Sequence, residues 1–190
     1  MKKHILMSLL FFGFSLIAAA ALQAAGPPQP GGQIPELKFP MPSERVDKAY
    51  LGLSGWGSTF RVPDIQARVV ILEILSMYCP FCQKEAPLVN DLFTAIEKDP
   101  ALKGKIKILG IGAGNSVYEV EVFRKKYGVP FPVVPDPDYE AHKAYGEVRT
   151  PYFVAVKISE NGTHEVIYSK LGSFGEAKSF LDNLRKLSGL

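Results

Sequence analysis

A seven-residue apolar stretch, Val69–Leu75, contains one acidic residue and leads into a helical pattern that begins near Pro80. A strand this apolar is expected to be buried on both faces, which requires a sheet with helices packed on each side. The two cysteines of the 190-residue chain, Cys79 and Cys82, lie at this junction. A thiol at a helix N-terminus lies beside unpaired backbone N–H groups and the positive end of the helix dipole, and both stabilise the thiolate. The pair is therefore predicted to be a redox centre, since the thiolate is the reactive form in disulfide exchange.

The rest of the chain continues the alternation of strands and helices. Strands are expected at residues 69–75, 106–111, 152–158 and 164–168, with two further short strands at 49–53 and 59–62. Helices are expected at residues 80–98, 117–127 and 139–145, and a last helix is expected near the C-terminus. The capping box Ser116-x-x-Glu119 starts the second of these helices, and the box Ser173-x-x-Glu176 starts the last. The first helix is expected to turn Leu88, Val89, Leu92, Phe93 and Ile96 inward. This order predicts an α/β fold of the thioredoxin-like kind, a mixed central β-sheet flanked by helices on both faces.

The two cysteines differ in their expected positions. Pro80 fits the first turn of a helix, because its missing N–H would have had no partner there. The sulfur of Cys79 is expected to lie outermost and that of Cys82 to be recessed, so Cys79 is the predicted attacking thiol and Cys82 the resolving one. A purely structural disulfide is the alternative, but a bridge that closes so small a loop would add little stability.

Glu73 is the charged residue of the apolar strand and precedes Cys79 by six positions. Buried there, its carboxyl would have a raised pKa and could accept the proton of the Cys82 thiol through water. A solvated glutamate at a sheet edge is the alternative. The Thr150–Pro151 bond at a strand entrance is expected to be cis, which would expose the Thr150 backbone to an extended substrate segment. An ordinary trans proline is the alternative reading.

Together these features resemble the extracytoplasmic thioredoxin-like proteins of the TlpA/ResA type, from about residue 36 to the C-terminus. The redox CxxC motif of that family matches Cys79 and Cys82, and its buried acid matches Glu73. Its kink proline matches Pro87, and its cis-proline loop matches Thr150-Pro151. The resemblance implies a thiol–disulfide oxidoreductase with an exported disulfide-containing protein as substrate, a membrane thiol protein as electron donor, and a role in cytochrome c maturation. No cofactor beyond the redox-active Cys79–Cys82 disulfide is implied, and we expect a monomer.

Two residues depart from related patterns. Tyr78 stands where tryptophan usually precedes the first cysteine, and Phe81 stands where the DsbA-type oxidases carry histidine. We expect both side chains to contact substrate, together with Thr150 and Pro151. The sequence between the motif and Thr150 is too short for the helical insertion of the DsbA type, so reduction is favoured over oxidation of exported proteins. Oxidation remains the alternative, and so does a substrate-binding module without turnover.

Other chemistries are disfavoured by the residues present. A peroxide-reducing site of this fold needs proline at position 72, which is Leu72 here. A metal site would need two more ligands than Cys79 and Cys82 provide, so none is expected. The glycine-rich stretch 110–114 lacks the spacing of a dinucleotide loop and is expected to form a loose turn beside the active site.

The N-terminus has the layout of a targeting segment. Residues 1–25 have two lysines, an apolar stretch and then small residues, as in a secretory signal peptide; an uncleaved membrane anchor is the alternative. Residues 26–42, rich in proline and glycine, are expected to be a linker before a thioredoxin-like domain at 43–190. Removal of residues 1–25 lowers the net charge from +3 to +1, which gives no reason to expect nucleic acid as a partner. These features predict a periplasmic or other extracytoplasmic location.

Overall fold

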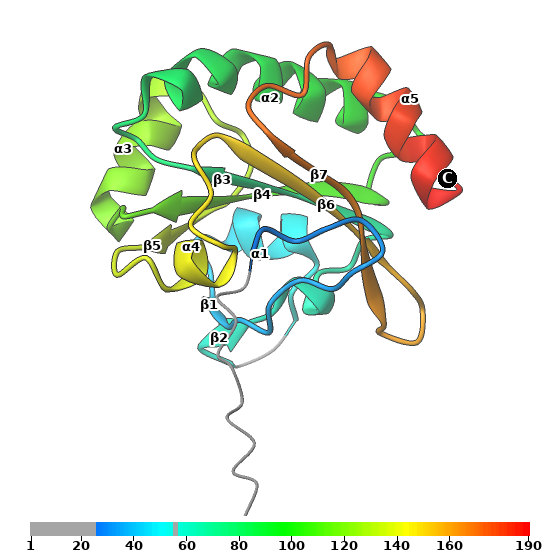
Figure 1. Cartoon of the computed structure of the whole chain (residues 1–190), viewed down its shortest axis with the longest axis horizontal. Helices are drawn as coiled ribbons and strands as arrows, with labels where there is room; N and C mark the ends of the chain where they lie inside the picture. The colour runs from blue at the N-terminus through cyan, green and yellow to red at the C-terminus, as the bar shows by residue number, and fades with distance from the viewer. Residues whose placement is uncertain (1–25, 55–56) are drawn as a thin grey trace, which may run out of the picture.

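The computed structural model describes residues 26–54 and 57–190, so the expected signal peptide or anchor at 1–25 lies outside the described residues (Figure 1). Five strands form one sheet in the order β5-β4-β3-β6-β7. They are β3 (Val69–Leu75), β4 (Ile106–Ala113), β5 (Val133–Asp136), β6 (Tyr152–Ile158) and β7 (His164–Leu171). The apolar strand β3 is central, because it pairs in parallel with β4 and antiparallel with β6.

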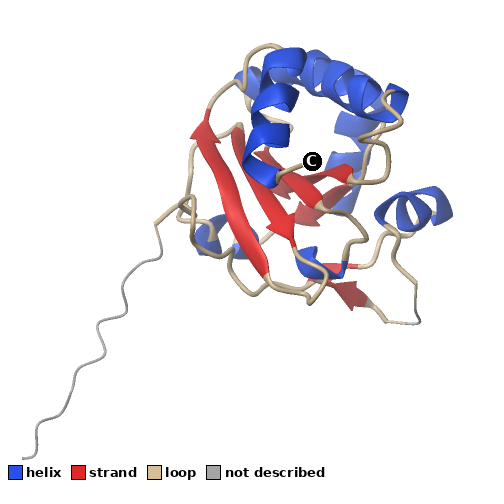
Figure 2. Cartoon of the chain, turned by 90° about the vertical axis from the view of Figure 1, so that its right-hand side faces the viewer, coloured by secondary structure: helices blue, strands red, loops and turns tan. Residues whose placement is uncertain are grey.

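Helices cover both faces of this sheet, as predicted. Figure 1 shows α2 and α5 above the sheet and α1 and α4 below it, and Figure 2 shows the same layers from the side. The helices are α1 (Arg45–Leu51), α2 (Pro80–Lys98), α3 (Val117–Tyr127), α4 (Glu140–Ala144) and α5 (Ala177–Ser188), with a 3-10 turn at Val62–Asp64. A small two-stranded antiparallel sheet of β1 (Phe39–Pro40) and β2 (Thr59–Phe60), which are connected through α1, lies on the face of α1 and α4.

Each face of the sheet has its own apolar core. Alternate residues of β3 point to opposite faces. Val69, Ile71 and Leu75 belong to the core beneath α2, α3 and α5, whereas Val70, Leu72 and Ile74 belong to the core shared with α1, α4 and the two-stranded sheet. The alternation therefore places the side chain of Glu73 on the α2 side, which is also the side of Cys82.

Three expected elements can be compared directly with the structure. The prediction of a strand at 49–53 is wrong, because helix α1 extends to Leu51. Leu51 is fully buried, and the helix ends at Gly52, which has a φ of 69°. The last helix begins at Ala177 instead of after Ser173, whose hydroxyl accepts a hydrogen bond from the Gly175 N–H at 3.1 Å and so stabilises the preceding turn. The predicted box at Ser116 is confirmed, since its hydroxyl accepts from the Glu119 N–H at 3.3 Å.

The glycines at 110 and 112 form part of β4 and do not form the expected loose turn. Both allow close packing in the strand. A Cβ atom on Gly110 would lie 2.8 Å from Val133, and one on Gly112 would lie 2.6 Å from Val120. Side-chain size at these two positions therefore sets how closely β5 and α3 approach β4.

The segment 26–42, expected to be a linker, packs along the domain. Gly31 donates its N–H to the Val166 carbonyl, and the Val166 N–H donates to the Gly32 carbonyl, both at 2.8 Å. These bonds cover part of the edge of β7, which would otherwise present unpaired backbone groups. Ile34 and Phe39 are buried. Between residue 26 and the C-terminus, apart from positions 55–56, no helix is both long and apolar enough to span a membrane.

Candidate active site

Cys79 lies at the N-cap of α2, with Pro80 at the first helical position as the sequence predicts. Its sulfur is partly exposed and donates a hydrogen bond to the Thr150 carbonyl, with an Sγ–O distance of 3.3 Å. Partial burial raises the pKa of the Cys79 thiol. Hydrogen bonds with the side chains of Thr150 and Cys82 and from the backbone N–H groups of Cys82 and Phe81 more than offset this, so the pKa of the Cys79 thiol is lowered overall. The sulfur is accessible and has increased thiolate character.

Cys82 lies one turn further along α2 and is fully buried. Burial raises the pKa of the Cys82 thiol far above its ordinary value, and the charge of the nearby Glu73 raises it further. Both cysteines are free thiols in this structure. The two sulfurs thus have opposite environments, because one lies beside helix N–H groups at the surface and the other lies in the apolar core.

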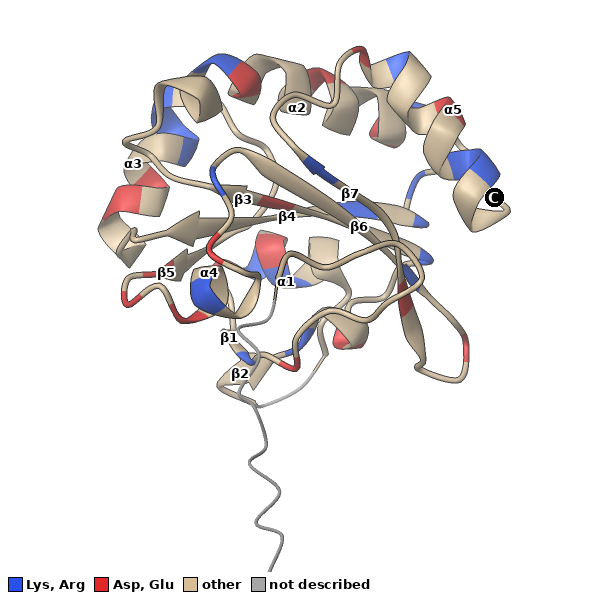
Figure 3. Ribbon diagram, in the orientation of Figure 1, with Lys and Arg blue, Asp and Glu red and all other residues tan. Residues whose placement is uncertain are grey.

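Glu73 lies in the middle of β3, where it pairs with Gly110 and Phe153 on the neighbouring strands. Figure 3 shows an acidic segment within the otherwise uncharged ribbon of β3. The residue is 2% exposed, so the solvated edge position is excluded. Burial raises the pKa of Glu73 to about 8, and the charge of Glu85 adds to the effect.

Glu85 is a second buried carboxylate, and it was not predicted from the sequence. It lies on α2 three residues after Cys82 and is 5% exposed. Within the described residues, Oε1 of Glu73 and Oε1 of Glu85 both lack a hydrogen-bond partner. The spacing of three residues places Glu85 on the same helix face as the buried cysteine, which is the signal that could have identified it.

The Thr150–Pro151 peptide bond is cis, and this loop lies against Cys79. The Pro151 carbonyl accepts a hydrogen bond from the Gly172 N–H at 2.9 Å, which ties the loop to the end of β7. On the other side of the cysteine, the buried Asn115 accepts the Met77 N–H through its Oδ1 at 2.8 Å. Asn115 was not predicted, and it holds the loop that leads into the motif.

Tyr78 and Phe81 are both highly exposed, at 66% and 69%. The Tyr78 hydroxyl donates to the Glu119 carboxylate at the start of α3, whereas Phe81 lines a groove on the opposite side of the motif. Leu88, predicted to point inward, is 40% exposed and lines the same groove. We call this the β7 groove. It has a volume of about 540 Å³ and is lined by Phe81, Lys84, Glu85, Leu88, Arg149, Thr150, Pro151, Leu171, Gly172 and Ser173.

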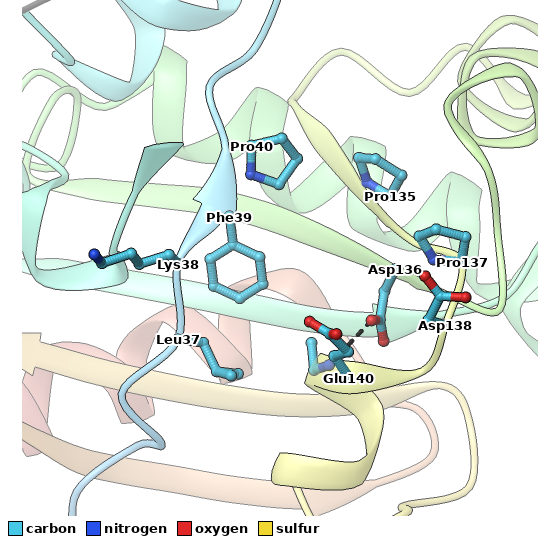
Figure 4. Close-up of a pocket in the computed structure, with 10 residues that line it drawn as sticks. Leu37, Lys38, Phe39, Pro40, Pro135, Asp136, Pro137, Asp138 and Glu140 are labelled. Atoms are coloured by element: carbon cyan, nitrogen blue, oxygen red, sulfur yellow. Dashed lines mark hydrogen bonds between the residues drawn. The ribbon is translucent and has the colours of Figure 1, made fainter. Parts of the chain in front are cut away.

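A second cavity, of about 280 Å³, lies between the β1 segment and the start of α4 (Figure 4). Its lining includes three acidic residues, but both oxygens of Asp136 already accept backbone N–H groups of Ala141 and His142, at 3.0 and 2.9 Å. None of its lining residues belongs to the dithiol motif or the cis-proline loop. Across the part of the chain that the structure describes, no group of three or more His, Cys, Asp or Glu residues is arranged to hold a metal ion.

The fold, with a dithiol at the start of a helix and a cis-proline loop against the outer sulfur, defines a thioredoxin-like thiol–disulfide oxidoreductase. The sequence profile of the AhpC/TSA family matches residues 30–166, and the chain belongs to this family. Among curated proteins, the thiol-disulfide oxidoreductase ResA of Geobacillus thermodenitrificans is 26% identical over 129 residues, which cover 68% of this chain and 70% of that protein. ResA of Oceanobacillus iheyensis is 25% identical over 156 residues, or 81% and 72% of the two chains.

Solved structures share the fold. StoA from Bacillus subtilis matches with a TM-score of 0.51 and 25% identity, over 67% of this chain and 90% of StoA. A secreted thiol-disulfide isomerase from Corynebacterium glutamicum matches with a TM-score of 0.58 and 18% identity, over 83% and 86% of the two chains. Both comparisons agree with the thioredoxin-like arrangement inferred from the strand order.

Proposed function

We propose that this chain is a protein-disulfide reductase of the extracytoplasmic space, in which Cys79 and Cys82 supply two electrons to disulfides of exported proteins. The observation that supports it most is the contrast between the two thiols. Cys79 is accessible, with a lowered pKa at the start of α2, whereas Cys82 is buried with a strongly raised pKa. An accessible thiolate can attack a substrate, and a protected thiol can resolve the product.

The reaction has two exchange steps. The Cys79 thiolate attacks one sulfur of the substrate disulfide, which forms a mixed disulfide and releases the other substrate sulfur as a thiolate that takes up a proton. The Cys82 thiolate then attacks the Cys79 sulfur, releases the first substrate sulfur, and leaves the Cys79–Cys82 disulfide. The substrate gains two electrons and two protons, and the protein dithiol loses them.

The second step requires that Cys82 lose its proton, and Glu73 is the proposed acceptor. A carboxyl with a pKa of about 8 exchanges protons near neutral pH. The Thr150 backbone beside Pro151 is the proposed docking edge for an extended substrate segment. Tyr78 and Phe81 are the exposed side chains on either side of Cys79 that we expect to contact that segment.

The buried thiol supports the reducing direction. In the oxidising direction Cys82 would be the leaving group, and a thiol of high pKa leaves slowly. The raised pKa of Cys82 therefore favours reduction over the alternative role as an oxidase. The export-type sequence of residues 1–25 supports the extracytoplasmic location. A membrane thiol protein is the proposed electron donor, and the cysteine pairs of c-type cytochromes are a substrate class to assay.

Trapping of the mixed disulfide tests the assigned roles. The Cys82→Ser variant should accumulate a mixed disulfide with an oxidised peptide, and the Cys79→Ser variant should not. Equal trapping by both variants, or by neither, would contradict the roles. The Glu73→Gln variant should resolve mixed disulfides more slowly, mainly near neutral pH, and an unchanged pH profile would refute its part in proton transfer. A variant without both cysteines that still binds substrate with full affinity would favour a binding module.

A further inference from the structure

The β7 groove lies next to the reactive sulfur and is connected to it through Thr150. Thr150 lines it, and the Thr150 carbonyl is 3.3 Å from Sγ of Cys79. Four of its ten lining residues have large apolar side chains: Phe81, Leu88, Pro151 and Leu171. Phe81, Leu88 and Leu171 are each at least 40% exposed, and together they form an apolar patch within one groove. A side chain next to a substrate cysteine would remove this apolar surface from water.

The charges of the groove are unbalanced. Lys84 and Arg149 are both exposed and line it from opposite elements, one from α2 and the other from the loop before Thr150. Among the described residues neither cation takes part in a salt bridge, whereas six other lysines and arginines do. The one acid in the lining is Glu85, which is 5% exposed. The accessible charge of the groove is therefore positive.

Arg149 also lines the neighbouring cavity of about 420 Å³ on the other side of the cis-proline loop. That cavity contains Glu147 and His142, and the His142 Nε2 is 2.8 Å from the Val148 carbonyl. The guanidinium thus stands at the boundary of the two hollows beside the docking edge. Its planar fork of donors suits a carboxylate better than an ammonium group would.

We propose that the β7 groove selects substrate disulfides whose cysteine is flanked by an apolar side chain and an acidic one. The apolar side chain packs between Phe81 and Leu88, and the carboxylate pairs with Arg149, with Lys84 adding long-range attraction. This inference rests on the proposed reductase function and names the substrate class for the same dithiol. The charge complementarity between an acidic segment and two accessible cations is what identifies the occupant.

The test uses the reduced full-length protein in single turnover, so that its own dithiol supplies the electrons. Three synthetic peptides have phenylalanine next to one cysteine and differ only two positions away, where they carry Asp, Asn or Lys. The cysteine of each is joined through a disulfide to thionitrobenzoate, whose release reports the attack of Cys79. The same set is made with the variable position before and after the cysteine.

The acidic peptide should react faster than the lysine peptide by about fivefold at low salt, the size expected for one solvent-exposed ion pair together with a longer-range attraction. The ratio should fall as salt is added. The double variant Lys84→Gln/Arg149→Gln should abolish the preference, and Arg149→Glu should reverse it. Lys125→Gln, which removes an exposed cation of α3 that does not line the groove, should keep the wild-type preference.

Equal rates for the three peptides, or a preference that survives the double variant, would overturn the inference while leaving the reductase function supported. If no peptide is reduced faster by the wild type than by Cys79→Ser, the reductase function itself fails. A rate per molecule that falls with protein concentration, and that Leu171→Ser restores, would show that a second copy of the chain covers the groove, which would also overturn the inference.

Discussion

The buried carboxyl of Glu73 should make the protein less stable as the pH rises, and Glu73→Gln should remove this dependence. The folded-state pKa is about 8, against an ordinary value of 4.5 in the unfolded chain. Between these values the folded state binds more protons than the unfolded state, so the free energy of unfolding falls with increasing pH. The contribution of protonated Glu73 to the free energy of unfolding is fully present below pH 4.5 and is lost as the pH rises to about 8.

The magnitude follows from the interval. At 1.36 kcal/mol per pH unit, the interval from 4.5 to about 8 corresponds to a loss of up to about 5 kcal/mol. Glutamine keeps the shape of the side chain and has no charge to bury. We therefore expect Glu73→Gln to become progressively more stable than the wild type between pH 4.5 and 8, with no further change above pH 8.

Urea unfolding of the reduced protein at a series of pH values measures this difference, and other titrating groups cancel when the two proteins are compared. Glu165→Gln, which removes an exposed carboxylate of β7, is the matched control and should follow the wild type. If Glu73→Gln and the wild type have parallel profiles from pH 4.5 to 8, Glu73 is ionised in the folded state at neutral pH, and the reasoning about its burial is wrong.

Three further predictions concern neighbouring features. Glu85→Gln removes a like charge and should therefore lower the pKa of Glu73. In the same urea series the loss of stability should then end at a lower pH, and an unchanged end point would contradict the electrostatic coupling between Glu73 and Glu85. Asp47→Ala should cost about 3 kcal/mol, because it leaves the partly buried Arg124 without its bidentate partner. Lys178→Ala, at a fully exposed pair, should have a much smaller effect, and similar losses for the two variants would contradict this ranking. Gly112→Ala should lower the free energy of unfolding by about 1–3 kcal/mol, because its Cβ would lie 2.6 Å from Val120. An unchanged midpoint of urea unfolding would show that α3 can shift freely.

Much of the fold could be predicted because its signals are local. The apolar run of β3, the pattern of α2 and the box at Ser116 each depend on residues near in sequence, and all three are confirmed. Helix α1 was missed because it has only seven residues, and packing of Leu51 against the sheet stabilises it more than its own pattern does. The course of residues 26–42 depends on pairing with Val166, which no local pattern encodes.

The site was predictable in part for the same reason. Cys79, Cys82 and Glu73 are close in sequence, so strand and helix periodicity place all three on one side of the sheet. Asn115 and Arg149 approach the motif only through tertiary structure, because they lie on loops far along the chain. Leu88 was predicted to face inward, and it lines the β7 groove at a place where α2 meets no covering element.

The reduction potential of the Cys79–Cys82 pair is the most direct test of the proposed reductase function. It is measured by equilibration with glutathione buffers, followed by alkylation of free thiols and mass spectrometry. The lowered pKa of Cys79 favours the reduced form, but the raised pKa of Cys82 is the larger shift and favours the disulfide, so we expect a reducing couple at about −230 to −270 mV. A value near about −120 mV would contradict the account, because a couple that oxidising would accept electrons from exported proteins and would not donate them.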